Sequence, residues 1–334
     1  MAGTVSEQNA RWMSLVAGKA VVPQPRETMA DLIASRGSLS ASPDERLPDG
    51  VVVETGVVIR GSSGLPLSAE ICRPAGDELF PVVVHFHGGG YCAGSAASER
   101  RVTAALAGHG FVVVAPDYAL APENPFPAAL EDAVLTVRWT AANAHRYGGD
   151  PGCILLEGGS AGAGLAASAM LVLSGAEHVD EDGMSDVEVS CAGLALLYGL
   201  FSFPLLLLEA GSNAGTAELW TQAYLGPQFS TRLWDPRASP LESRDLGRFP
   251  PVYLSCGSLD SMLPQTLRLA ERLSLSDVET TVSVIPDVDH AFAKYLHPGP
   301  TEAAELHRIH TWMAARSPGH PGIAQPFGPS KDAS

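Results

Sequence analysis

Short apolar runs recur through the middle of the chain and alternate with longer amphipathic segments. Residues 81–86 and 111–115 are almost continuously apolar, which is typical of central strands covered on both faces. Further strand-like runs lie at 51–53, 57–59, 67–72, 153–156, 193–197, 252–254 and 282–285, and the last of these is expected to end the sheet.

Helical patterns separate these runs, at 97–107, 128–144, 161–173 and 265–273. Strands that alternate with helices predict βαβ units and a mostly parallel sheet with helices on both faces. The fold class expected from the pattern is therefore α/β, with about eight strands in one sheet.

Three segments depart from this alternation. Residues 1–45 contain helical patches and no strong strand, which predicts N-terminal cap helices. Residues 198–246 interrupt the alternation inside the main domain, 46–316, and are interpreted as a cap insertion over the carboxyl edge of the sheet. Residues 317–334 are rich in Pro, Gly and Ser and predict a disordered tail.

Composition narrows the classes of partner. The chain has 334 residues, of which 46% are hydrophobic and 17% charged, an ordinary globular balance. The formal net charge of −16 would repel nucleic acid and anionic membranes. We expect a small-molecule ligand and no nucleic acid, and a homodimer is compatible with the sequence.

Location is predicted from three features. Residues 192–208 carry no charge, but Gly199, Ser202 and Pro204 interrupt them, so we interpret a buried strand and an apolar cap element rather than a stable membrane insertion. Residues 1–10 are polar and unlike a signal peptide. The cysteines lie far apart, at Cys72, Cys92, Cys153, Cys191 and Cys256. Reduced, mostly buried thiols in a cytoplasmic protein are expected.

Ser160 lies in a strand–turn–helix pattern that suits a nucleophile. Residues 155–162 read Leu-Leu-Glu-Gly-Gly-Ser-Ala-Gly, a strand followed by G-x-S-x-G and a small-residue helix. Glycines two positions before and after the serine remove the Cβ atoms that would clash in so tight a turn. A Gly/Ala-rich packing turn remains the plain alternative.

A second alternative uses the same residues. Residues 162–167 fit a loose G-x-G-x-x-A fingerprint for dinucleotides, but they follow about the fifth strand rather than the first. Neither Glu177 nor Asp180 is clearly placed to bind a ribose. The sequence thus predicts no cofactor.

A glycine loop, His87-Gly88-Gly89-Gly90, follows the predicted strand 82–86 directly. Consecutive glycines let backbone N–H groups approach a ligand oxygen, and no Lys with Ser or Thr follows as a P-loop requires. His85 and His87 alternate on the strand, yet no further ligands join them, so no metal is expected.

Asp260 and His290 complete a candidate catalytic triad with Ser160. Each lies in a loop after a predicted strand, and the chain order Ser, Asp, His is that of α/β-hydrolases. Asp287 and Asp289 are rival acids, but they share the loop of the histidine and are expected to be solvated.

These motifs together resemble the hormone-sensitive-lipase-like esterases of the α/β-hydrolase fold. The resemblance is carried by His87–Gly90, Asp117–Glu123, Pro125–Ala129, Gly158–Gly162 and Asp235-Pro236 with Ser239-Pro240. It implies the triad above and oxyanion-hole N–H groups from Gly88, Gly89 and Ala161. Aromatic candidates for substrate contact are Tyr91, Tyr198, Phe201 and Trp220.

The chain departs from this family at four positions. Where the family usually has an acid, an arginine and two glycines, this chain has Gly159, Ala119, Ala163 and Ala291. The expected activity is cleavage of short- to medium-chain carboxylic esters through an acyl-enzyme. A specialised lactonase, deacylase or acyl-transferring cyclase at the same site is the main alternative. A non-catalytic receptor is disfavoured because His290 is present.

Overall fold

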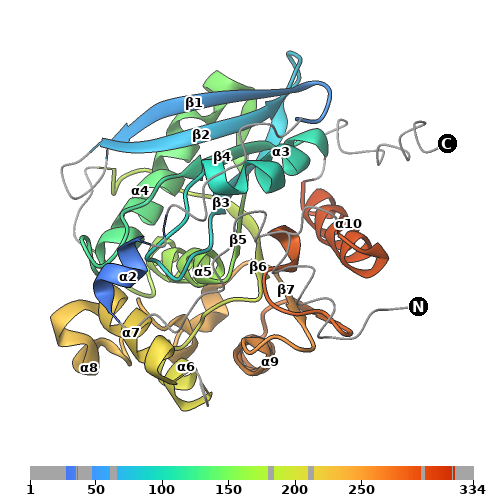
Figure 1. Ribbon diagram of the computed structural model, residues 1–334. Helices are drawn as coiled ribbons and strands as arrows, with labels where there is room; N and C mark the ends of the chain where they lie inside the picture. Colours follow the sequence, from blue (N-terminus) through green and yellow to red (C-terminus); the bar gives the residue numbers. More distant parts are fainter. Residues whose placement is uncertain are drawn as a thin grey trace.

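The computed structural model describes residues 28–34, 36, 47–60, 66–179, 184–209, 214–294, 298–317 and 319. Eight strands in these ranges form one sheet, in the order β1-β2-β4-β3-β5-β6-β7-β8 (Figure 1). The strands are β1 (Val51–Arg60), β2 (Pro66–Pro74), β3 (Phe80–Phe86), β4 (Val112–Pro116), β5 (Gly149–Gly159), β6 (Cys191–Leu197), β7 (Val252–Gly257) and β8 (Thr280–Ile285).

The sheet is mostly parallel, as predicted. Strand β2 pairs antiparallel with both β1 and β4, and all other neighbours are parallel. The runs at 51–53 and 57–59, expected as two strands, belong to the single strand β1, whose register shifts between Glu54 and Val57. A bulge keeps both halves in one ladder, because it absorbs the extra residues without ending the pairing.

Helices cover both faces of the sheet. They are α2 (Met29–Ala34), α3 (Arg100–Gly108), α4 (Ala128–Asn143), α5 (Ala161–Leu173), α6 (Phe203–Glu209), α7 (Ala214–Leu225), α8 (Phe229–Arg232), α9 (Leu263–Leu275) and α10 (Pro300–Ala315). Short 3-10 turns are η2 (Ala97–Glu99), η3 (Ala144–Tyr147), η5 (Gly226–Gln228), η6 (Pro240–Glu242), η7 (Leu246–Arg248) and η8 (Phe292–Lys294).

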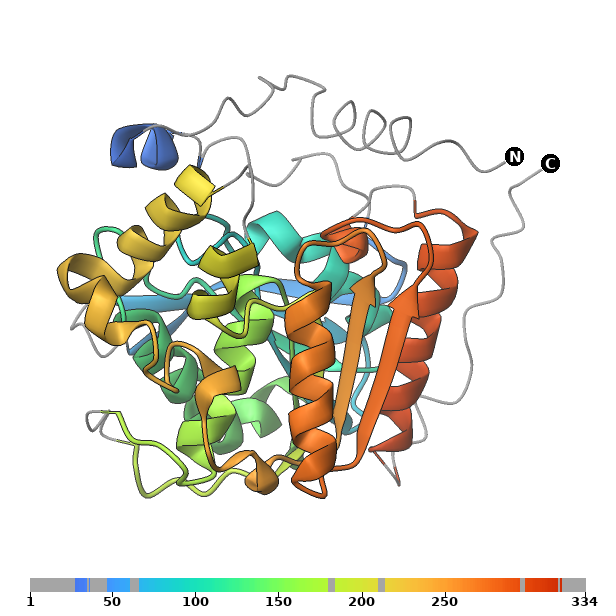
Figure 2. The same cartoon turned by 90° about the horizontal axis from the view of Figure 1, so that it is seen from below.

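Two apolar cores lie on the two faces of the sheet. Val82 and Val84 of β3 point into the core shared with α4, α5 and α9. Val83 points into the other core, which α3 and α10 cover. In Figure 2, β7 and β8 run between α9 and α10. The alternation of side chains along each strand explains why the central strands read as continuous apolar runs.

The segment expected as a cap insertion contains helices α6, α7 and α8. They lie beside α2 in both views, away from the β1–β2 edge of the sheet (Figures 1 and 2). Most of the N-terminal segment 1–45 and of the tail 317–334 lies outside the described residues. Within the described ranges no helix is long and apolar enough to cross a membrane. Residues 192–208 supply most of β6 and α6, as interpreted.

The five cysteines all fall in described parts of the chain, and none of them is in a disulfide. Four are buried and Cys191 is half-buried. Burial raises the pKa of the thiols of Cys72, Cys153 and Cys191. These side chains act as small apolar residues in the core, as expected from their scattered spacing.

Candidate active site

Ser160 lies on a sharp turn between β5 and α5, at the carboxyl edge of the sheet. Its φ of 57° is in the left-handed region, where a residue with a Cβ is strained. The Ser160 N–H donates to the carbonyl of Leu197 on the neighbouring strand β6, at 2.9 Å. A Cβ at Gly158 would approach the backbone of Gly162 to 2.6 Å, and one at Gly162 would collide with the Phe86 carbonyl. The two glycines are therefore required by the close packing of this turn.

Close packing of α5 also explains the glycines that fit the loose dinucleotide fingerprint. Gly162 packs against β3, and a Cβ at Gly164 would collide with the Leu200 carbonyl. Both glycines are buried inside α5. They allow the helix to approach the sheet and the segment after β6, and they leave no open loop for a pyrophosphate.

Asp260 and His290 meet Ser160 from two other loops. His290 Nε2 lies 3.0 Å from Ser160 Oγ, and His290 Nδ1 lies 2.8 Å from Asp260 Oδ2. The Asp260 side chain is fully buried, and its Oδ1 also accepts the Met262 N–H at 2.8 Å. The predicted three residues thus form one hydrogen-bonded chain.

The rival acids have other positions. Asp287 is exposed, as expected. Asp289 is half-buried, and its carboxylate accepts the backbone N–H of His290 at 2.7 Å. The imidazole Nδ1 pairs with Asp260 at 2.8 Å, so Asp260 is the acid that orients the ring.

Tyr198 packs beside the His290 ring and is itself in contact with Phe292. The rings of Tyr198 and His290 meet edge to face, with centroids 5.1 Å apart, and Phe292 contacts Tyr198 in the same way. Ala291 has a φ of 62°, which explains why a glycine is usual in this family after the histidine. The alanine keeps that conformation at some strain.

Gly159 is explained by Tyr198. A Cβ at Gly159 would lie 2.6 Å from the Tyr198 ring and 2.7 Å from its hydroxyl. The tyrosine therefore fills the space into which an acidic side chain at position 159 would extend. The other two departures are local: the Ala119 N–H donates to Asp132 at 2.9 Å, and Ala163 is buried within α5.

The glycine loop after β3 differs from the expectation at one residue. The Gly88 N–H donates to Glu99 Oε1 at 2.7 Å, so it is already bound and does not face a substrate. The N–H groups of Gly89, Gly90 and Ala161 have no acceptor within the described parts of the chain. The expectation for Gly88 is corrected accordingly, because one amide hydrogen cannot serve both the carboxylate and a substrate oxygen.

Gly89 and Gly90 need their lack of side chains. Their φ values are 130° and 60°, and a Cβ at Gly89 would collide with the carbonyl of Ala93. A Cβ at Gly90 would overlap the indole ring of Trp220 from α7. The cap insertion therefore packs directly on the glycine loop.

The four aromatic candidates for substrate contact separate by burial. Tyr91, Tyr198 and Phe201 are at most 1% exposed, whereas Trp220 is half-buried. The Tyr91 ring stacks on Tyr224 at 3.8 Å, inside the core. Trp220 is thus the one of the four candidates with appreciable exposed surface, and contact of any of them with a substrate stays a prediction. Tyr198 borders the triad through His290.

His85 and His87 have separate environments rather than a shared metal. His85 Nδ1 contacts the Glu157 carboxylate of β5, and its Nε2 lies 3.0 Å from Glu99 Oε2. The His87 ring stacks on Tyr118 at 4.1 Å, and the Tyr118 hydroxyl donates to the His87 carbonyl. No group of described residues is arranged to hold a metal ion.

These environments shift the two histidines in opposite directions. Burial alone would lower the pKa of His85, but the carboxylates of Glu157 and Glu99 outweigh it and raise that pKa to about 10. Burial lowers the pKa of His87 to about 4. At neutral pH the first ring is a cation and the second is neutral.

The ion pairs around His85 were not expected from the sequence. Lys294 of η8 also pairs with Glu99, so one carboxylate joins β3, the glycine loop and η8. The signal available in the sequence was Glu157, an acid in the apolar run 153–158, on the strand that neighbours His85. The pairing of His85 with Glu157 could not be predicted, because the order of the strands in the sheet cannot be read from the sequence alone.

The charge on His85 predicts how stability depends on pH. Its folded-state pKa is raised, so the stabilisation is complete below about pH 6.5 and is lost as the pH rises toward about 10. We expect the free energy of unfolding of the native protein to fall by about 1 kcal/mol or more between pH 7 and 10 relative to a His85→Gln/Glu157→Gln variant. Denaturant titrations at several pH values measure this difference. Parallel pH profiles for the two proteins would contradict it.

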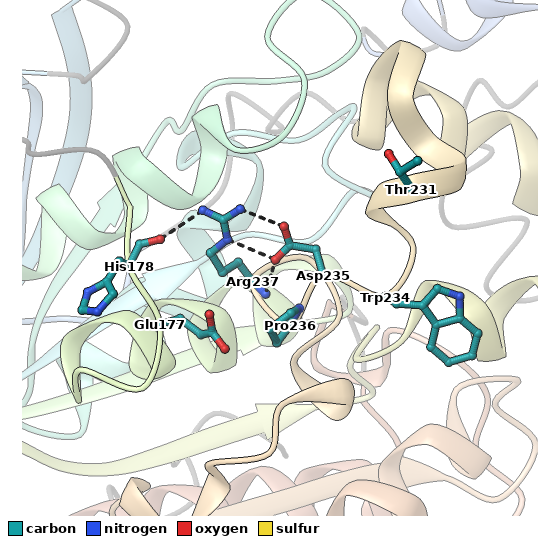
Figure 3. Close-up of a pocket in the computed structure, with 7 residues that line it drawn as sticks. All are labelled: Glu177, His178, Thr231, Trp234, Asp235, Pro236 and Arg237. Carbon is teal, nitrogen blue, oxygen red and sulfur yellow. Dashed lines mark hydrogen bonds and ion pairs between the residues drawn. The ribbon is translucent and has the colours of Figure 1, made fainter.

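A surface depression lies apart from the triad. It is lined by Glu177, His178, Thr231, Trp234, Asp235, Pro236 and Arg237, and Figure 3 shows these side chains. Arg237 pairs with Asp235 at 2.8 Å and donates to the His178 carbonyl. The Asp235-Pro236 signature thus anchors the end of the cap insertion, and no lining residue belongs to the triad or the glycine loop.

Comparisons with known proteins agree with this geometry. The family profile of the alpha/beta hydrolase fold matches residues 83–294. Carboxylesterase NlhH of Mycobacterium tuberculosis is 28% identical over 268 residues, covering 76% of this chain and 79% of the relative. An acetyl-hydrolase of Streptomyces hygroscopicus is 32% identical, covering 69% and 74%. The crystal structure of esterase LipW from Mycobacterium marinum is 25% identical, with a TM-score of 0.73 over 87% of this chain and 91% of that one.

The chain belongs to the α/β-hydrolase fold family, in its hormone-sensitive-lipase-like branch. It is a serine hydrolase, as its relatives and the order of its motifs agree. The expected fold class and enzyme class are both confirmed.

Proposed function

We propose that this enzyme cleaves carboxylic esters through an acyl-enzyme formed on Ser160. The observation that carries the proposal is the continuous hydrogen-bonded chain from Asp260 through His290 to the serine hydroxyl, at 2.8 and 3.0 Å. Such a chain turns a weakly nucleophilic hydroxyl into one that can attack a carbonyl carbon. The names of its relatives, a carboxylesterase and an acetyl-hydrolase among them, support an ester as substrate.

The reaction divides into acylation and deacylation. Ser160 Oγ forms a bond to the ester carbonyl carbon while His290 Nε2 takes its proton, and Asp260 stabilises the resulting imidazolium. The C–O bond to the alcohol then breaks, and His290 returns the proton to the leaving oxygen. Water, deprotonated by His290, attacks the acyl-enzyme and releases the carboxylic acid and free Ser160.

Backbone amides stabilise the negative charge that develops on the carbonyl oxygen. We assign this role to the N–H groups of Gly89, Gly90 and Ala161, which are without acceptors among the described residues. Ala161 is the first residue of α5, so the positive end of the helix dipole reinforces its N–H. Donors fixed before the reaction stabilise the transition state without reorganisation.

The proposal also includes a helical cap that limits the length of the acyl chain. Helices α2 and α6–α8 form the cap over the catalytic domain 46–316, and Trp220 brings the insertion against the glycine loop. A cap packed this closely favours short- to medium-chain acyl groups. The same proposal includes a cytoplasmic location, which is favoured by cysteines without a pairing pattern. The net charge of −16 disfavours nucleic acid as a partner.

A panel of p-nitrophenyl esters with acyl chains from acetyl to palmitoyl tests the proposal. We expect hydrolysis of the short and medium chains and little turnover of the longest. Labelling by a fluorophosphonate probe without turnover of any ester would contradict ester hydrolysis and favour a specialised lactonase, deacylase or cyclase. The change from acid to Gly159 beside Tyr198 is the feature that motivates this second candidate.

A further inference from the structure

Glu99 is a buried carboxylate that touches the glycine loop, although the proposed reaction does not use it. It ends η2 just before α3 and is 3% exposed. Its Oε1 accepts the Gly88 N–H at 2.7 Å, and its Oε2 lies 3.0 Å from His85 Nε2. Lys294 pairs with the same Oε1.

The surrounding charges keep this carboxylate ionised. Burial opposes the charge, but Lys294 and His85 outweigh burial and lower the pKa of Glu99 well below its usual range. His85 is in turn held by Glu157, three residues before the serine on β5. Two cations and two anions thus compensate one another, which is the condition for ions to remain buried.

The cluster lies between the two loops that form the site. A Cβ built on Gly88 would lie 3.3 Å from Lys294 Nζ and 3.5 Å from Ser160 Cβ. Lys294 belongs to η8, which follows the His290 loop directly. Glu99 therefore connects the glycine loop with the segment after His290, and through His85 it is linked to the strand before the nucleophile.

We propose that Glu99 is a positioning residue that fixes the oxyanion loop through the Gly88 amide. Holding Gly88 fixes where the next two N–H groups, of Gly89 and Gly90, point. A charged acceptor makes a stronger hydrogen bond than a neutral one, and a displacement of about 1 Å in a catalytic group can cost about 100-fold in rate. The inference rests on the proposed function of this loop.

Two substitutions at Glu99 separate the hydrogen bond from the charge. Glu99→Leu removes both, whereas Glu99→Gln keeps an oxygen that can accept the Gly88 N–H. Glu70→Leu and Glu70→Gln are matched controls, because Glu70 is also buried, at 6% exposure, and pairs with Arg100 next to Glu99. In the described part of the chain the hydrogen bonds of the Glu70 carboxylate go to Arg100, and none joins it to the glycine loop or the triad.

Two measurements are made on each full-length variant. The first is the rate constant for labelling of Ser160 by a fluorophosphonate, which loses fluoride to the serine oxygen and places its phosphoryl oxygen in the oxyanion hole, without cleavage of a carboxylic ester. The second is kcat and KM for p-nitrophenyl acetate. If Glu99 only supported the fold, its substitutions would change the amount of active enzyme. The kcat of each active molecule would then be about equal in the two Glu99 variants.

For Glu99→Leu we expect labelling and kcat to fall about 100-fold, with KM changed by about twofold or less. Glu99→Gln should recover about tenfold of that loss, and both Glu70 variants should stay within about threefold of the native protein. Equal losses at Glu99 and Glu70, or an effect on KM alone, would overturn the proposal. If Glu99→Leu does not fold, Glu99→Gln is compared with Glu70→Gln instead. Equal labelling rates in these two variants would overturn the proposal.

The labelling measurement also separates this inference from the proposed function. Native protein that is labelled rapidly but hydrolyses no ester overturns ester cleavage and leaves the Glu99 comparison intact. Native protein that is not labelled at all overturns both, because the loop then stabilises no oxyanion.

Discussion

Replacing Ser160 with alanine is expected to lower kcat for p-nitrophenyl butyrate by about 10⁴-fold or more. The hydroxyl is the only group in the hydrogen-bonded chain that can form the acyl bond, and alanine has no atom that can take its place as the nucleophile. What remains is the contribution of binding and of the oxyanion donors. The turn itself should survive, since alanine accepts the same φ of 57° at a strain close to that of serine.

The matched control for this substitution is Ser174→Ala. Ser174 follows the opposite end of α5, and its hydroxyl donates to the Leu171 carbonyl at 3.1 Å. We expect kcat to be unchanged there and unfolding temperatures to be similar in both variants. Ester hydrolysis near the native rate in the Ser160 variant would remove this serine as the nucleophile.

The second large effect is expected at Asp260. Its replacement with asparagine should lower kcat by about 10³- to 10⁴-fold, with KM little changed. An amide can donate to His290 Nδ1 and so stabilise the wrong tautomer, with the hydrogen on the nitrogen that faces Ser160. The Met262 N–H, which Oδ1 accepts, would lose its charged partner as well.

Asp287→Asn is the control for this prediction, because it makes the same chemical change in the loop of His290. The residue is exposed and has a φ of 58°, a conformation that asparagine tolerates. We expect near-native kcat. A loss of kcat at Asp287 as large as that at Asp260 would contradict the assignment of Asp260 as the acid of the triad.

Much of the fold could be predicted because its signals are local. Runs such as 81–86 and 153–156 are apolar on both faces, and this pattern follows directly from helices covering each side of the sheet. The single strand β1 was expected as two, because Gly56 and its neighbours break the pattern, while pairing with β2 continues across the bulge. Pairing partners lie far away in the sequence and decide such cases.

The order of Ser160, Asp260 and His290 was readable for a similar reason. Each follows a strand, and parallel strands bring their carboxyl ends to one edge. The sequence also predicted the glycine loop, but it could not predict the direction in which each backbone N–H of the loop points. Gly88 and Gly89 are identical in sequence terms, and only the neighbouring Glu99 carboxylate distinguishes them.

Burial was harder to predict than position. Tyr91 and Phe201 lie beside site motifs in the sequence, yet the first stacks on Tyr224 and the second packs against Gly199. An aromatic ring near a site can point into the core or toward a ligand, and the choice depends on which rings from other elements meet it.

The sequence by itself determined the α/β architecture, the serine-hydrolase class and the three candidate residues of the triad, since periodicity and chain order are properties of the chain. Only the tertiary structure decided which amides remain without partners, why Gly159 faces Tyr198, and how Glu99 joins His85, Gly88 and Lys294. These contacts depend on strand order and on distances across separate loops. A buried charge or a bound amide is defined by its neighbours in space, and those neighbours are set when the chain folds.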